Sequence, residues 1–269
     1  MKQEQEQDVN ATTPDKQIGA APAKSTKSTK PVKNFYEPYI TPPFLYHALR
    51  FFCLFVFHTF SRLRLIGLYH VPTKGAFIIA SNHLSWTDIP LIPLHLRRKV
   101  VYMAKEEYFS SKLAWLVRFL GAFPVKRGEG DRQALRAAEE QLKKGNILVI
   151  FPEGTRSRSR TMAQAHAGMG MIALRTGVPV VPVAIWGSEN SLKKPGARVT
   201  ISYGQPMTLK PKGKKVTRED INEATELVMH KIAELLPPEY RGVYGEPGTT
   251  NQITQDKSEK TDSSDSASD

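Results

Sequence analysis

The sequence predicts an α/β fold, in which a single domain with a central, largely parallel or mixed sheet flanked by helices follows an N-terminal helical segment. From Val71 onward, short apolar runs alternate with stretches of helical period, which is typical of strands joined by helices. Hydrophobic residues make up 40% of the 269 residues, enough for a substantial core. Polar residues that follow the strands are expected at the carboxyl edge of the sheet, where ligands bind in such folds.

Composition divides the chain into four parts. Residues 1–33 are mostly Gln, Lys, Thr, Ala and Pro, and residues 249–269 are rich in Ser, Asp and Lys. Both are expected to be disordered tails, the second of them acidic. Residues 34–68 are expected to form a membrane-associating helical segment, and residues 69–248 the α/β domain. An ordinary secretory signal peptide is not expected, because no apolar run lies near the first residue.

The helical segment contains an aromatic run, Phe44–Phe60, which begins after the pair Pro42-Pro43. This run is shorter than the roughly 20 apolar residues that a bilayer span needs, and Arg50 interrupts it. The basic stretch Ser61-Arg62-Leu63-Arg64 follows. Such a composition favours a helix that lies in the membrane interface, with an ordinary core helix as the alternative.

Six strands and five helices are expected in the domain. The strands are Phe77–Ala80, Val100–Ala104, Ala122–Lys126, Ile147–Phe151, Val180–Ile185 and Val199–Tyr203. The helices are Thr87–Leu96, Tyr108–Leu120, Asp131–Lys144, Gln164–Thr176 and Arg218–Leu236. Two prolines lie in the stretch Val178–Ile185, and proline cannot donate to a sheet ladder. This strand is therefore expected at a sheet edge or with an irregular start.

The formal net charge is +12, and a basic domain favours anionic partners. Nucleic acid, an anionic membrane surface and phosphorylated substrates all fit this charge. Nucleic acid is not expected as a partner, because the aromatic residues concentrate in Phe44–Phe60 instead of alternating with the basic ones. The single Cys53 rules out an internal disulfide, which fits a reducing compartment.

A histidine and an aspartate five positions apart follow the first strand of the domain. His83 can take a proton at cellular pH, and Asp88 can orient the imidazole if the chain folds back between them. The alternative is a turn histidine followed by a helix-capping aspartate. The pair by itself does not decide between these two interpretations.

Two further blocks present cations and backbone donors at strand ends. In the block Phe123–Gly128, Arg127 offers a planar fork that suits phosphate oxygens, although a basic strand end is more often a solvated face. The block Phe151–Ser157 joins Gly, hydroxyl and Arg residues that can hold an oxyanion or phosphate. Its Glu153 is expected to need a partner such as Arg156.

Several other kinds of site are not expected. The sequence contains no Gly-x-Ser-x-Gly elbow, P-loop, dinucleotide-binding glycine pattern or Cys/His cluster. No metal and no cofactor are therefore expected.

Taken in order, these blocks resemble the glycerolipid acyltransferases, especially the 1-acyl-glycerol-3-phosphate acyltransferases. The resemblance rests on Asn82-His83 with Asp88, on Phe123–Gly128, on Phe151–Ser157 and on the Val-Pro-rich strand Val178–Ile185. It covers about residues 68–204, roughly half of the chain. One departure is Ala165-His166-Ala167-Gly168, where many members have a Phe-Lys-x-Gly stretch. The acceptor head group is accordingly less well defined than the chemistry.

The resemblance implies an O-acyltransferase of phospholipid biosynthesis on the cytoplasmic face of the membrane. His83 would be the general base and Asp88 its orienting partner. The residues implied to bind the substrate phosphate are Arg127, Arg156 and Lys105, and those implied to shape the acceptor site are Glu153, Gly154, Thr155 and Ser157. The acyl donor would be acyl-CoA or acyl carrier protein, and the acceptor 1-acyl-glycerol-3-phosphate. Alternatives are another lysolipid acceptor, such as a lyso-ornithine lipid or glycolipid, and a non-catalytic lipid-binding protein.

Overall fold

The computed structural model describes residues 42–96, 98–112, 114–125 and 132–245. Both expected tails and Arg127 lie outside the described residues. The helices are α1 (Pro43–Phe60), α2 (Asp88–Leu91), α3 (Ala114–Phe119), α4 (Arg132–Lys143), α5 (Gly168–Thr176) and α6 (Arg218–Leu235). The strands are β1 (Ser61–Ile66), β2 (Phe77–Ser81), β3 (Val100–Lys105), β4 (Ala122–Val125), β5 (Ile147–Ile150), β6 (Val180–Trp186) and β7 (Ala197–Tyr203).

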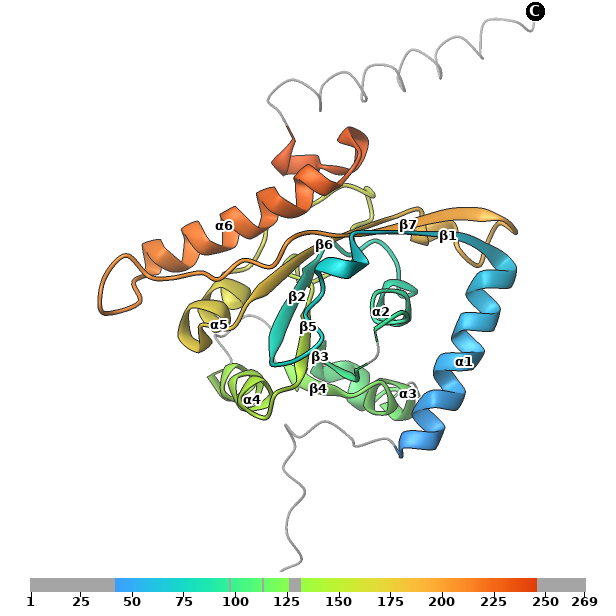
Figure 1. Ribbon diagram of the computed structural model, residues 1–269, viewed down its shortest axis with the longest axis horizontal. Coiled ribbons are helices and arrows are strands. Elements are labelled where there is room, and N and C mark those ends of the chain that lie inside the picture. The colour runs from blue at the N-terminus through green and yellow to red at the C-terminus, as the bar shows by residue number, and fades with distance from the viewer. Residues whose placement is uncertain (1–41, 97, 113, 126–131, 246–269) are drawn as a thin grey trace, which may run out of the picture. The chain divides into compact units, whose positions relative to one another are not determined.

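The strands form one mixed sheet in the order β1-β7-β6-β2-β5-β3-β4 (Figure 1). Strands β2, β3, β4, β5 and β6 run parallel to their neighbours within this group, whereas β7 is antiparallel to β6, and β1 is parallel to β7. The expected α/β fold with a parallel or mixed sheet is confirmed. Because β2 lies between β5 and β6, the carboxyl ends of all three meet at one edge, where ligands bind in such folds.

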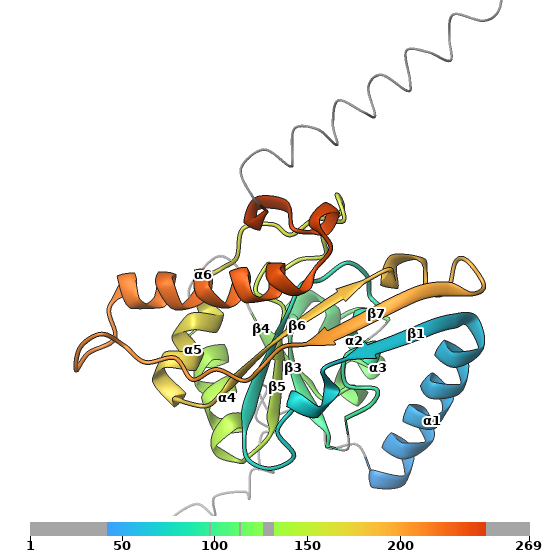
Figure 2. The ribbon, with the colours of Figure 1, turned by 45° about the horizontal axis from the view of Figure 1, so that its top comes forward.

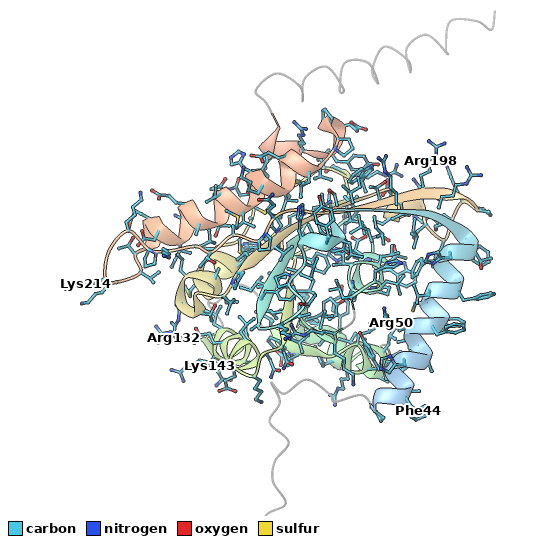
Figure 3. The ribbon with its side chains drawn as sticks, in the orientation of Figure 1. Phe44, Arg50, Arg132, Lys143, Arg198 and Lys214 are labelled. Carbon is cyan, nitrogen blue, oxygen red and sulfur yellow. The ribbon has the colours of Figure 1, made fainter. Side chains whose placement is uncertain are left out.

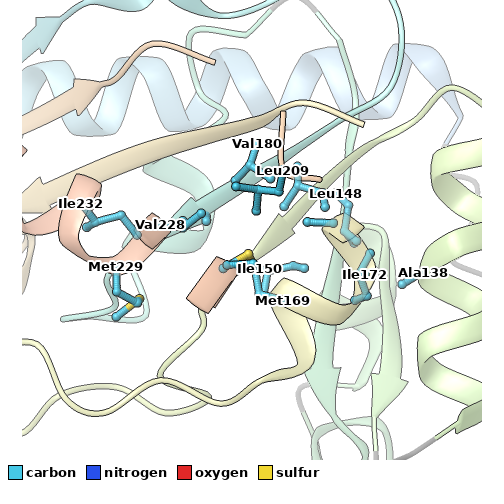
Figure 4. Packing of buried hydrophobic residues seen from close by; sticks show 14 of the residues in the cluster. Ala138, Leu148, Ile150, Met169, Ile172, Val180, Leu209, Val228, Met229 and Ile232 are labelled. Atoms are coloured by element: carbon cyan, nitrogen blue, oxygen red, sulfur yellow. The ribbon is translucent and has the colours of Figure 1, made fainter. Parts of the chain in front are cut away.

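Helices cover both faces of the sheet. Figure 2 shows α4, α5 and α6 on one side and α1, α2 and α3 on the other. Alternate residues of β2 enter the two cores: Ile78 and Ala80 pack with residues of α4, α5 and α6, and Phe77 and Ile79 pack with Phe57 of α1. Figure 4 shows part of the first core, in which Ile150 of β5 lies near Met169 of α5. All residues of β2 are buried, which explains its continuous apolar run.

Helix α1 has one packed face and one exposed face. Cys53, Leu54 and Phe57 pack against the core, and Arg50 donates from Nε to the Leu94 carbonyl over 2.9 Å (Figure 3). Large aromatic side chains line the exposed face: Phe44, Phe51, Phe52 and Phe55. No helix in the described part of the chain is long and apolar enough to cross a membrane.

The structure corrects the expected helical segment 34–68 at its carboxyl end. The helix ends at Phe60, and Ser61–Ile66 forms strand β1, which pairs in parallel with β7. Leu63 and Leu65 pack against the core that contains α1, whereas Arg62 and Arg64 are exposed. The alternation of buried and exposed residues with a period of two is therefore what makes this segment a strand and not a helix.

The expected edge position of the Pro-rich strand is wrong, because β6 lies between β7 and β2. The β6–β7 ladder extends from Val183 to Trp186, so the missing N–H of Pro182 falls just outside it. The Pro182 carbonyl still accepts the Gly204 N–H at 2.8 Å. An interior strand can thus hold a proline where its partner strand has ended.

Three helices are shorter than expected. Helix α3 starts at Ala114 instead of Tyr108, because Tyr108 and Phe109 belong to a separate 3₁₀ helix, Glu106–Phe109. Helix α2 ends at Leu91 instead of Leu96, since Pro93 cannot donate a helical hydrogen bond. Helix α5 starts at Gly168 instead of Gln164. The preceding N–H groups of Ala163 and Ala165 donate to side chains, so this segment bonds across the fold instead of along a helix.

Candidate active site

Strand β2 carries the site at its carboxyl end. Asn82 follows the strand and uses its side-chain amide as an extra rung of the sheet: Nδ2 donates to the Ile185 carbonyl at 2.8 Å, and Oδ1 accepts the Ile185 N–H at 2.9 Å. These two hydrogen bonds fix the residue directly before His83 to β6. Sequence analysis gave Asn82 no role of its own, although its place before His83 was a usable signal.

His83 and Asp88 form a buried hydrogen-bonded pair. His83 Nδ1 lies 2.8 Å from Asp88 Oδ2, and the Asp88 side chain is fully buried. The same oxygen accepts the backbone N–H groups of Leu84 and Ser85 at 2.7 and 2.8 Å. Asp88 therefore holds the turn that begins at His83 and does not act as the cap residue of α2, a position that Thr87 occupies. With Nδ1 as donor, His83 Nε2 keeps its lone pair free to accept a proton.

The His83 ring is held by stacking as well. Its centroid lies 4.0 Å from that of Phe151, with an angle of 18° between the ring planes. Phe151 follows β5, the neighbour of β2, so the sheet brings the two rings together. The His83 side chain is 11% exposed, which leaves limited access from solvent.

The loop after β5 wraps the main chain of His83. Glu153 Oε1 accepts the His83 N–H at 3.1 Å, and the Ser157 N–H donates to the His83 carbonyl at 2.8 Å. Glu153 Oε2 accepts the Ala163 N–H at 2.9 Å. The partners of Glu153 are thus two backbone amides, and the expected pairing with Arg156 is wrong. Two blocks far apart in the sequence form one structural unit.

Burial raises the pKa of Glu153 to about 7, from an ordinary value of 4.5. The side chain is 3% exposed, so loss of hydration disfavours its ionised form. The two amide donors lower this pKa and the nearby Asp88 carboxylate raises it, both to a smaller extent. Glu153 therefore titrates close to neutral pH.

Gly154 allows the loop to turn tightly beneath the site. Its φ is 66°, and a Cβ placed there would lie 2.9 Å from Cδ2 of His166. The left-handed conformation favours glycine at this position, and a Cβ would also displace the exposed His166 ring. His166 is itself held by its N–H bond to the Pro152 carbonyl at 2.9 Å.

The expected cationic residues differ in placement. Arg156 and Thr155 are exposed on the loop next to His83, and Ser157 contacts Ser159 through the two Oγ atoms at 3.2 Å. Lys105 ends β3, and its Nζ lies 2.8 Å from Glu107. Arg127 follows β4 but lies outside the described residues. The structure thus gathers the first and third blocks around His83, whereas Lys105 stands on a strand two places away.

Within the described ranges, no group of three or more His, Cys, Asp or Glu side chains could hold a metal ion. The chemistry of the described residues lies in the imidazole, the buried carboxylates and the exposed arginine. Together with the fold, they define an α/β protein whose histidine–carboxylate pair can take a proton next to a loop that can hold an anion.

Comparison with known proteins gives the family. A sequence model described as Acyltransferase matches residues 62–186. The chain is 31% identical over 172 residues to 1-acyl-sn-glycerol-3-phosphate acyltransferase of Bacillus subtilis, covering 62% of this chain and 84% of that protein. It is 39% identical over 107 residues to lyso-ornithine lipid O-acyltransferase of Pseudomonas aeruginosa, covering 39% of this chain but only 41% of that protein.

A solved structure agrees with these relatives. The crystal structure of the 1-acyl-sn-glycerophosphate (LPA) acyltransferase from Thermotoga maritima superposes with a TM-score of 0.54 and 31% identity, covering 70% of this chain and 79% of that chain. The chain therefore belongs to the acyltransferase family that includes the 1-acyl-sn-glycerol-3-phosphate acyltransferases. The expected resemblance and its O-acyltransferase class are confirmed at the level of the family.

Proposed function

We propose that the protein transfers a fatty acyl group from an acyl thioester to the free hydroxyl of 1-acyl-glycerol-3-phosphate, giving phosphatidic acid. The observation that carries this proposal is the buried pair of His83 Nδ1 and Asp88 Oδ2 at 2.8 Å, wrapped by the loop that presents Arg156. An intact pair argues against a merely lipid-binding protein on this scaffold. Family membership supports a lysolipid acceptor. The thioester donor is what the resemblance of the sequence blocks implies.

In the proposed mechanism, His83 Nε2 takes the proton of the acceptor hydroxyl while the oxygen of that hydroxyl attacks the thioester carbonyl. The carbon–oxygen bond forms, and the tetrahedral intermediate then collapses with loss of the carbon–sulfur bond. The leaving thiolate receives the proton from the imidazolium. Asp88 orients the ring and stabilises its charged form throughout. No acyl-enzyme is required, because the acceptor hydroxyl is itself the nucleophile.

Thiol release from acyl-CoA by the detergent-solubilised protein, with and without lysophosphatidic acid, tests the proposal. We expect release that depends on the acceptor. A parallel reaction with acylated acyl carrier protein identifies the donor. No acceptor-dependent release with either donor would overturn the proposed function.

A second candidate acceptor is a lyso-ornithine lipid. The 39% identity to the Pseudomonas aeruginosa enzyme favours it, as does the stretch Ala165–Gly168, which lacks the lysine of many family members. A panel of lysophosphatidic acid, lyso-ornithine lipid and other lysolipids in the same assay separates these acceptors by kcat/KM.

We expect Arg156→Ala to raise the acceptor KM about 10- to 100-fold with the donor KM unchanged. The proposed role of Arg156 is to bind the acceptor phosphate, and a charge-assisted hydrogen bond contributes about 1.5–3 kcal/mol. Arg136→Ala, on the exposed face of α4, is the matched control. Equal changes in both KM values would mean that Arg156 does not contact the head group.

Attachment to an anionic membrane surface, on the cytoplasmic face, is part of the proposal. Phe51, Phe52 and Phe55 of α1 are 60–73% exposed, and the chain carries a net charge of +12. Replacing all three with serine is expected to weaken co-flotation with anionic vesicles at least about tenfold, since each exposed ring can bury apolar area in lipid. Leu227→Ser, at an exposed site on α6, is the control. Unchanged flotation of the triple variant would exclude α1 as the membrane contact.

A further inference from the structure

The residues that directly precede His83 and Asp88 are both bonded to the same strand end. Asn82 forms its two amide bonds with Ile185, within β6. Thr87 donates from Oγ1 to the carbonyl of Ser188 at 3.0 Å, three residues further along. The residues directly before His83 and Asp88 are therefore hydrogen-bonded to the carboxyl end of β6 and to the turn that follows it.

The Thr87 hydroxyl is directed away from its own helix. A threonine in this position ordinarily caps the helix that it begins, but Thr87 makes no side-chain cap bond to α2. It is 2% exposed, and besides the Ser188 carbonyl it contacts Ser85 and Ser191, whose Oγ atoms lie 3.0 and 3.2 Å from Thr87 Oγ1. Ser191 is fully buried, and its carbonyl accepts a hydrogen bond from Ser61 Oγ at 2.6 Å. Buried hydrogen bonds through the carbonyl and the hydroxyl of Ser191 thus connect the start of β1 to the start of α2.

Helix α2 spans only Asp88–Leu91, so its placement depends on its connections. At its carboxyl end, the hydroxyls of Tyr102 and Tyr203 donate to the carbonyls of Ile89 and Ile92, both at 2.6 Å. At the end that bears Asp88, Thr87 supplies the bond to the turn after β6. Loss of that bond would remove the tie between the turn after β6 and the residue next to Asp88, whose carboxylate must stay 2.8 Å from His83.

We propose that Thr87 is a positioning residue that holds Asp88 in register with His83, and that Ser191 supports it. This inference rests on the proposed function of the pair. It assigns Thr87 no contact with substrate: the hydroxyl acts through Asp88. A misplacement of about 1 Å in a catalytic group can lower the rate by about a hundredfold.

The first test is a set of three variants assayed by acceptor-dependent thiol release. Thr87→Val keeps the shape but removes the hydroxyl, and we expect kcat to fall about a hundredfold with both KM values within about twofold of wild type. Thr87→Ser keeps the hydroxyl and is expected to stay within about threefold of wild type. Thr225→Val is the matched control, because Thr225 is 3% exposed and bonds only the Ile221 carbonyl of its own helix at 2.8 Å in the described structure.

The second test asks whether Thr87 acts through Asp88. In an Asp88→Asn background, Thr87→Val is expected to change kcat by less than about twofold, since the interaction that it supports is already lost. An equal loss of kcat in both backgrounds, a change confined to KM, or a Thr87→Ser variant as slow as Thr87→Val would each overturn the proposal.

A third readout does not depend on turnover. Diethyl pyrocarbonate acylates the free imidazole nitrogen, and mass spectrometry of the peptide that contains His83 gives the rate. We expect His83 to react in Thr87→Val as slowly as in Asp88→Asn, and in Thr225→Val at the wild-type rate. A wild-type rate in Thr87→Val would overturn the positioning role. If the wild-type enzyme transfers no acyl group, the proposed function fails while this measurement still decides the role of Thr87.

Discussion

Replacing His83 with alanine is expected to lower kcat for acyl transfer by about a thousandfold, with the fold intact. General-base catalysis by a positioned imidazole contributes about 100- to 10,000-fold. His83 is stacked on Phe151 and bonded to Asp88, so its position is fixed before substrate binds. The measurement is acceptor-dependent thiol release under saturating donor and acceptor.

The matched control is His70→Ala. His70 bonds a backbone carbonyl through Nδ1, at Tyr203, and belongs to the short 3₁₀ turn after β1. Circular dichroism and thermal unfolding in detergent show whether each variant is folded. A folded His83→Ala protein with wild-type turnover would refute the role of His83 as general base.

Glu153→Ala is expected to lower the free energy of unfolding by about 1–3 kcal/mol. The substitution leaves the buried N–H of His83 without its acceptor, and an unpaired buried donor costs about 1–3 kcal/mol, whereas the N–H of the exposed residue Ala163 can bond to water instead. It also releases the loop that carries Arg156, so activity should fall with stability. Urea unfolding at pH 5 measures the change, because there the Glu153 carboxyl is protonated in the folded protein and wild type bears little of the cost of burying the charge.

The exposed Glu234→Ala, on α6, serves as the control, with an expected change of less than about 1 kcal/mol. An unfolding free energy of Glu153→Ala equal to that of wild type would show that other groups satisfy both amides. In that case the wrapping of His83 by this loop would not depend on the carboxylate.

Glu153 also predicts a pH dependence of stability. Its pKa is about 7 in the folded protein and 4.5 ordinarily, so between these values the folded protein holds a proton that the unfolded chain has released. Stability should therefore fall as the pH rises through this window, by up to about 3 kcal/mol. Glu153→Gln does not titrate, so its difference from wild type should change between pH 5 and pH 8. A constant difference would contradict the raised pKa.

Much of the fold could be predicted from the sequence because its signals are local. The apolar runs of β2 and β5 predicted buried strands. The order of strands and helices predicted a sheet flanked by helices. The misassigned elements are those whose state depends on distant partners. Strand β1 exists because β7 is available to pair with it. Gln164–Ala167 is not helical because Glu153 and Tyr244 accept the N–H groups of Ala163 and Ala165.

The site divides in the same way. His83 and Asp88 could be proposed from residue type and spacing, since a turn between a strand and a helix returns the chain over five residues. The partner of Glu153 could not, because two backbone amides that bind it come from residues 70 and 10 positions away. The charge of Arg156 can be read from the sequence, whereas backbone N–H donors cannot, because every residue except proline has one. This difference explains why Arg156 was predicted as the partner of Glu153.

By itself the sequence determined the class of fold, the family resemblance and which residues are proposed to transfer a proton or to hold an anion. Those properties depend on side-chain chemistry and on periodicity, which each segment carries in its own residues. Only the tertiary structure decided that Asn82 is bonded to β6, that Thr87 is bonded to the turn after β6, and that the third block encloses His83. Such contacts join segments up to about a hundred residues apart, and the register of the sheet sets which groups meet.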